Sequence, residues 1–210
     1  MRKKILVAVG ILAVFVCGGC SATELEDRNF PMMAAVDYEE GQVLFAYGFP
    51  ELNQKDNTDL EEAKVNAPMS AGNDFAESVR DFEQEMNKLA DCNHMKVLVL
   101  GENLMREKEL YEDMLSYLKE TELFPRNTYV CVVKDVRELF DIEENLPEDL
   151  GTYLESYLQN HESNRQLTRM NLGKLLDEKE NQKEIVLLPY LEMEDGAVLW
   201  NKNWNLEKSD

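Results

Sequence analysis

Histidine is scarce in this sequence, and the residue patterns of known catalytic sites are missing. His94 and His161 are the only two histidines, and they lie far apart in the chain. There is no zincin, nucleophile-elbow, dinucleotide-binding or P-loop motif. Cys92 precedes His94 by two positions, but one Cys/His pair supplies too few ligands for a metal site. We therefore expect no enzyme, no metal and no cofactor; an extracytoplasmic hydrolase would need a nucleophile or metal site that this sequence does not display.

Basic residues are also few. There are 22 Lys and Arg against 42 Asp and Glu, which gives a formal net charge of -20 at pH 7. Phosphate backbones repel such a chain, so we expect no nucleic-acid partner. Excess acidic residues usually form a solvated surface. Calcium binding is the alternative, but no D-x-[DN]-x-[DN]-G loop is present to support it.

The first two of only four cysteines, Cys17 and Cys20, form a C-x-x-C where an apolar run ends. The chain starts with MRKK, continues with apolar residues over 5–16 and reaches Cys20 through two glycines. Spanning a bilayer takes about 20 apolar residues, whereas a secretory signal needs about 7–15. This order is typical of a bacterial lipobox, with Cys17 where Leu is usual. We predict a lipoprotein signal peptide over 1–19 and a diacylglyceryl group on Cys20; a single-span anchor that retains 1–19 is the alternative.

The other two cysteines and the two tryptophans lie in the body of the chain. Cys131 falls inside an apolar strand pattern and Cys92 just before another. A disulfide between them is conceivable in an exported protein, but we favour two buried thiols that act as small hydrophobic residues. Trp200 and Trp204 could stack on a ligand, although packing in the core or a hairpin is the favoured interpretation.

The hydrophobic pattern predicts a tether over 20–29, a single domain over 30–206 and a tail over 207–210. Two apolar runs, 30–38 and 42–49, surround a turn at Gly41 and predict a hairpin. A long loop over 50–73, with a helical turn near DLEEAK, precedes a helix over 74–90 with Asn73 as its N-cap. The apolar stripe of this helix could be a partner-binding seam, but packing on the domain's own sheet is favoured.

The centre of the chain predicts a βαβ crossover. An apolar strand over 95–100, a helix over 107–120 and a β-branched strand over 128–133 imply adjacent parallel strands. Short helices are expected over 135–140, 150–158 and 172–176, and an edge strand over 185–193 because it contains Pro189. A turn at Asp195-Gly196 and a last small hairpin over 197–206 complete the pattern. The expected fold class is α/β mixed (α+β): a mixed β-sheet with flanking helices and small hairpins.

The segment DCNHMKVLVLGENLMRE, residues 91–107, carries a motif made of His94, Lys96, Gly101 and Glu102. At these positions it resembles the Ger(x)C family, the lipoprotein C subunits of spore nutrient-germinant receptors. ELEDR, TYVCVVKD, LGKLLD and DGAVLWNKNWNL follow the family's order, so the resemblance covers most of residues 20–206. Ser21-Ala22 replaces the Trp-Asp that often follows the lipid cysteine. Family members normally continue into further domains, so we expect a shortened member.

The resemblance implies a mixed α/β domain beside an A-type subunit and a transporter-like B-type subunit, and no known catalytic reaction. We therefore expect a lipid-anchored, non-enzymatic accessory subunit of a germinant-receptor-like membrane complex. It would be held on the extracytoplasmic face of a membrane, which is the inner spore membrane if it acts in germination. A lipid-anchored protein that binds a small molecule is the alternative, and it predicts a saturable thermal shift with its ligand.

Overall fold

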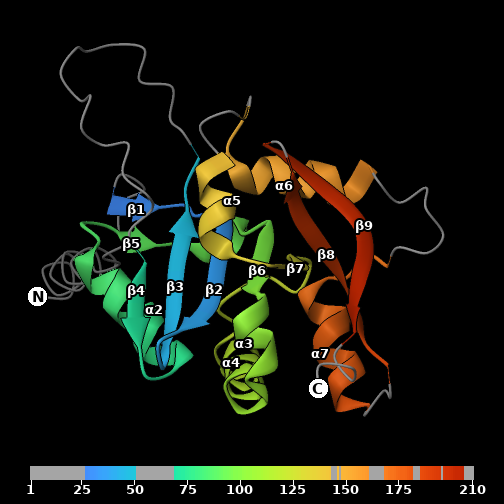
Figure 1. The fold of residues 1–210 in the computed structure, drawn as a ribbon. Helices are drawn as coiled ribbons and strands as arrows, with labels where there is room; N and C mark the ends of the chain where they lie inside the picture. Colours follow the sequence, from blue (N-terminus) through green and yellow to red (C-terminus); the bar gives the residue numbers. More distant parts are fainter. Residues whose placement is uncertain are drawn as a thin grey trace, which may run out of the picture.

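The fold is seen in a computed structural model, which describes residues 27–50, 69–142, 146, 148–160, 168–181, 185–194 and 196–205. Seven strands form one mixed sheet in the order β4-β3-β2-β6-β7-β8-β9 (Figure 1). These strands are β2 (Met33–Glu39), β3 (Gln42–Gly48), β4 (Ser70–Gly72), β6 (Val97–Gly101), β7 (Tyr129–Val133), β8 (Leu187–Glu194) and β9 (Ala197–Asn205). A separate two-stranded sheet joins β1 (Arg28–Asn29) to β5 (Leu89–Ala90). The expected mixed α+β class is confirmed.

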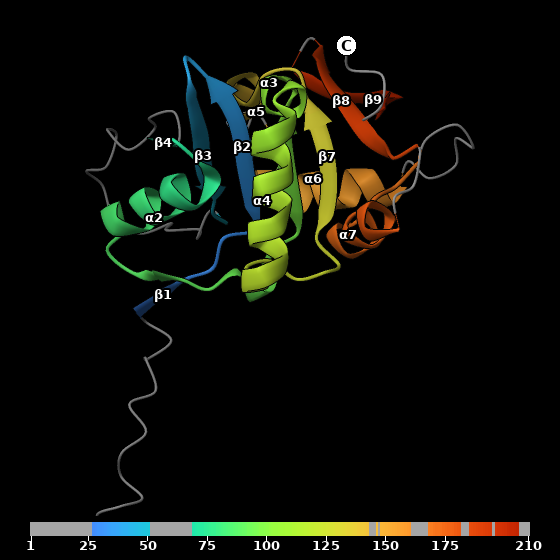
Figure 2. The same cartoon turned by 90° about the horizontal axis from the view of Figure 1, so that it is seen from below.

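Helices cover both faces of the large sheet. They are α2 (Phe75–Glu85), α3 (Glu102–Arg106), α4 (Lys108–Thr121), α5 (Val136–Ile142), α6 (Leu150–Asn160), α7 (Leu172–Glu180) and the 3-10 helix η2 (Cys92–His94). Figure 2 shows α4 lying across one face, with α5 and α6 behind the sheet. An edge-to-face contact between Phe75 and Tyr117 joins α2 to α4, and an ion pair between Lys119 and Glu180 joins α4 to α7. Because helices lie on both faces, all five residues of β6 are buried.

The predicted hairpin and crossover are both confirmed. β2 and β3 pair antiparallel up to Glu39 opposite Gln42, and the two residues between them, Glu40 and Gly41, have φ of 50° and 87°. Positive φ at both positions is the geometry of a type I′ turn, whose twist suits a hairpin. β6 and β7 are adjacent and parallel, with Val97 opposite Tyr129. The crossover contains α3 as well as the expected α4, because helix begins directly after Gly101.

The second half of the sheet corrects two predictions. β8 is an inner strand rather than an edge, since it pairs with β7 on one side and β9 on the other. Pro189 is tolerated there because pairing with β7 starts only at the next residue, Tyr190, and covers two positions. Residues 197–205 form one strand, β9, and not a hairpin. The turn before it is at Gly196, with φ of 76°.

Residues 168–171 lie beside the first half of β7, where the short pairing with β8 does not reach. Val130 N donates to Met170 O, and Leu172 N donates to Thr128 O. An isolated bridge also joins Tyr129 to Asn171. The backbone that leads into α7, rather than β8, therefore completes the hydrogen bonding at the start of β7. The β8–β9 hairpin pairs with β7 only at Val132 and Val133.

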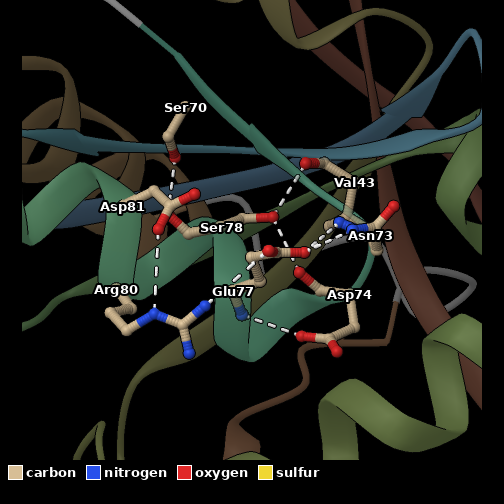
Figure 3. A network of polar contacts seen from close by, with 8 residues as sticks. All are labelled: Val43, Ser70, Asn73, Asp74, Glu77, Ser78, Arg80 and Asp81. Carbon is tan, nitrogen blue, oxygen red and sulfur yellow. Dashed lines mark hydrogen bonds and ion pairs between the residues drawn. The ribbon is translucent and has the colours of Figure 1, made fainter.

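The region around α2 corrects three more predictions. Residues 70–72, expected in a loop, form edge strand β4, while the expected helical turn near DLEEAK lies outside the described residues. The helix ends at Glu85 rather than at 90, and Leu89 belongs to β5. Its N-cap is Asp74, whose carboxylate accepts from Glu77 N at 2.8 Å, and not Asn73. The side chain of Glu77 in turn accepts from Asn73 N, an arrangement like a capping box (Figure 3).

Ser78 ties α2 to the sheet from its buried position. Its hydroxyl lies 2.8 Å from both Val43 O and Asp74 O, and its own carbonyl accepts from the hydroxyl of Ser70 at 2.6 Å (Figure 3). The apolar side of α2, including Val79, packs into the domain core, as favoured from the sequence. In the described part of the chain, no helix combines the length and apolarity that crossing a membrane requires.

Candidate functional site

Cys20, the one site residue predicted from the sequence, lies outside the described residues. The described chain starts close by, and β1 fixes it to the domain. Arg28 forms an ion pair of 2.6 Å with Asp91, and Asp91 N donates to Asn29 O at 2.8 Å. The hydrogen bond from Arg28 is the main reason why the pKa of Asp91 is lowered. The end of the predicted tether is therefore a paired strand that meets β5.

Three hollows follow one another along the surface from β1 and β5 to the start of α7. The first, of about 320 Å³, is lined by Arg28, Leu89 and Asn93 among others. Asn93 also lines a second hollow of about 380 Å³ between α4 and α7, whose apolar lining includes Phe124. Arg126 joins this second hollow to a third, of about 510 Å³, at the start of α7. All three are open to solvent and carry charges of both signs, which suits contact with another surface better than enclosure of a substrate.

The two thiols in the body are free and buried, so the disulfide is not formed and the favoured interpretation is confirmed. Burial raises the pKa of Cys92 to about 11, although a hydrogen bond with the hydroxyl of Tyr47 opposes the shift. Burial also raises the pKa of Cys131. Thiolate is the reactive form of cysteine, so neither residue is placed for nucleophilic or redox chemistry at neutral pH.

The structure also shows the surroundings of His94 and of the two tryptophans. The ring of His94, which is exposed, lies edge-on to Phe30 at 5.7 Å. Trp200 is a buried core residue, and Trp204 stacks on Tyr190 at 5.7 Å, so packing is confirmed for both indoles. His161 lies outside the described residues. Within the described ranges, no group of three or more His, Cys, Asp or Glu is placed to hold a metal ion.

The most unusual polar group in the described structure is Asp37, which the sequence analysis missed. It lies on β2, is 3 % exposed, and accepts hydrogen bonds from Tyr38 N at 2.8 Å and Leu104 N at 3.3 Å through one carboxylate oxygen. Gly101 makes room for it, since a Cβ at that position would lie 1.9 Å from Asp37 Cγ. A single acid inside the apolar run MAAVDY was the signal in the sequence.

Burial dominates the electrostatics of Asp37 and raises its pKa to about 6. The two backbone hydrogen bonds oppose this shift, and the negative charges of Asp135 and Glu39 add to it. Arg137 lies on the exposed side of this cluster, where it pairs with Glu39 at 2.8 Å. The arrangement gives the start of α3 a buried acceptor that can gain a proton in the mildly acidic range.

The chain was also compared with known proteins. A family model described as the spore germination protein N-terminal domain matches residues 21–193. The match begins one residue after Cys20 and ends inside β8, so it covers all of the sheet except β9 and the last residue of β8. No curated protein and no solved structure matches the chain.

Proposed function

The chain belongs to the family that shares the spore germination protein N-terminal domain, and from this membership we propose that it is a lipid-anchored accessory subunit of a membrane complex that senses germinants. The membership itself gives the chain a germination-related role. The anchor, the complex and a non-catalytic way of acting are the parts that we propose. The observation that carries the proposal is the match over residues 21–193, which starts next to the predicted lipid attachment site.

In this proposal Cys20 carries a diacylglyceryl group on the extracytoplasmic face of the inner spore membrane. Each buried CH₂ contributes about 0.8 kcal/mol, and two acyl chains hold a protein stably where one is marginal. An anchor of this kind offsets the repulsion between anionic lipids and a chain with 42 Asp and Glu residues. It also raises the local concentration of the domain beside A-type and B-type subunits, so that modest contacts suffice for docking.

The surface of the domain is compatible with docking. The second and third hollows, beside α4 and α7, present charges of both signs, and the second adds apolar side chains such as Phe124. Asp37 and Cys131 line none of the three hollows, and Cys92 lines the one beside β1 but is buried. We assign all three residues structural roles. The proposed subunit therefore acts by contact with its neighbours.

The test combines the mass of the native N-terminal peptide with identification of the proteins that co-purify from detergent-solubilised sporulating cells. We expect a peptide that begins at diacylated Cys20 and polytopic membrane subunits in the same fraction. Cys20→Ser should abolish lipidation and flotation with membranes, whereas the matched control Cys17→Ser should retain both, because Cys17 leaves with the signal peptide. A native chain that begins at Met1 and stays in the aqueous fraction would refute the anchor, and an anchored chain with no polytopic partner would refute the complex.

A further inference from the structure

We propose that the end of the domain formed by β1, β5 and η2, here called the β1–β5 end, lies against the bilayer surface with Leu89 in the lipid interface. This inference rests on the proposed function, because it takes Cys20 as the anchored residue. It adds an orientation and a lipid-contacting surface, neither of which follows from family membership.

The first argument is the length of the tether. Seven residues lie between Cys20 and Arg28, and the eight Cα-to-Cα steps of a fully extended chain span at most about 28 Å. At Arg28 the chain is held by the ion pair to Asp91 and by pairing of β1 with β5, so the effective tether ends there. The β1–β5 end therefore cannot move further than this distance from the anchored cysteine.

The second argument is the size of the domain. A compact domain of this length is about 40 Å across. Figure 2 shows β1 at one extremity of the molecule and the tips of β2 and β3 at the opposite one. To place the β2–β3 turn on the bilayer, the tether would have to span nearly the whole domain, which exceeds its reach. The geometry thus favours contact through the β1–β5 end or the sides close to it.

The third argument is the chemistry of that end. Leu89 is 62 % exposed, and among the described residues only it and Ile185 are large hydrophobic side chains with such exposure. Asn87 and Lys88, directly before it, are also exposed. A leucine beside a lysine suits a bilayer interface, because the apolar side chain enters the acyl boundary while the ammonium group stays near the phosphates. One such residue adds little affinity alone, but it can set the orientation of an anchored domain.

The test uses the full lipidated chain in vesicles of phosphatidylcholine and phosphatidylglycerol that contain spin-labelled quencher lipids. A fluorophore is attached through Asn87→Cys, which leaves Leu89 intact, or through the matched control Gln42→Cys at the β2–β3 turn. The native Cys92 and Cys131 are buried and should not compete for the label. We expect the quencher lipids to reduce the emission at position 87 at least twofold more than at position 42.

A further variant separates contact from simple proximity. Leu89→Ser, made in the Asn87→Cys background, should reduce the quenching about twofold because the apolar side chain no longer enters the interface. Equal quenching at positions 87 and 42, stronger quenching at 42, or no effect of Leu89→Ser would overturn the proposal. Flotation of the same sample distinguishes the two levels of failure: a chain that does not float overturns the anchor and the orientation together, whereas one that floats without quenching at 87 overturns the orientation alone.

Discussion

Replacement of Asp37 by asparagine should make the stability of the domain less dependent on pH. Burial raises the pKa of Asp37 from 3.8 to about 6, so the folded state holds a proton that the unfolded state has released in this range. The contribution of Asp37 to stability therefore falls as pH rises from about 4 to 6 and is constant above. The difference in pKa corresponds to about 3 kcal/mol of free energy of unfolding lost at neutral pH. Asparagine keeps the oxygen that accepts from Tyr38 N and Leu104 N but carries no charge.

The assay is urea unfolding of the wild type and Asp37→Asn at about pH 5 and about pH 7.5. The amide adds buried donors whose cost is the same at both pH values, so only the change with pH is diagnostic. Relative to the wild type, the variant should gain about 1.5 kcal/mol between the two conditions. Asp113→Asn, at an exposed position of α4, is the control and should show no such gain. Equal pH dependence in the wild type and Asp37→Asn would refute the argument, because the carboxyl group would then not titrate near 6.

Three further outcomes follow from buried groups. Gly101→Ala should destabilise the domain by about 1–3 kcal/mol, because its methyl group would collide with Asp37; adding Asp37→Ala should restore part of the loss in Tm, and no recovery would contradict the contact. Ser78→Ala should lower the free energy of unfolding by about 1–2 kcal/mol, since a buried hydroxyl between two carbonyls is lost; a neutral effect in urea unfolding would show that these bonds are dispensable. Cys92 and Cys131 should react with Ellman's reagent only in denaturant, and rapid native reaction of either would exclude the burial described.

Local patterns were enough to predict the central part of the fold. The two-residue turn at Glu40 and Gly41 fixes the register of β2 and β3, so the hairpin could be predicted from neighbouring residues alone. The crossover from β6 to β7 followed from two apolar runs with a helical pattern between them. In the hairpin the short turn, and in the crossover the intervening helix, determine which strands become neighbours.

The errors arose where distant residues decide the outcome. Pro189 was placed on an edge because proline lacks a donor, but the position of residues 168–171 shortens the pairing beside it, and nothing local to the strand encodes that. Strand β4 depends on β3 and on Ser78 for its contacts. Asp37 was overlooked since its importance comes from Gly101, 64 positions later, which alone leaves room for the carboxylate. The predicted lipid site is different in kind, because a processing motif is recognised from its local sequence and not from the packing of the domain.

The short pairing between β7 and β8 affects how the domain unfolds locally. Only two strand-pairing positions join the β8–β9 hairpin to β7, while eight pairs hold its own two strands together. Hydrogen bonds that involve side chains add to this junction, such as the one that the hydroxyl of Tyr190 donates to Glu102. We expect such a unit to detach as a whole, with loss of the core contacts of Leu188, Leu191 and Trp200. The amides of β8 and β9 should then exchange with solvent through partial unfolding events that leave β2, β6 and β7 protected. The last hairpin would then be the final piece to dock during folding, and the first region where heat or force loosens the molecule.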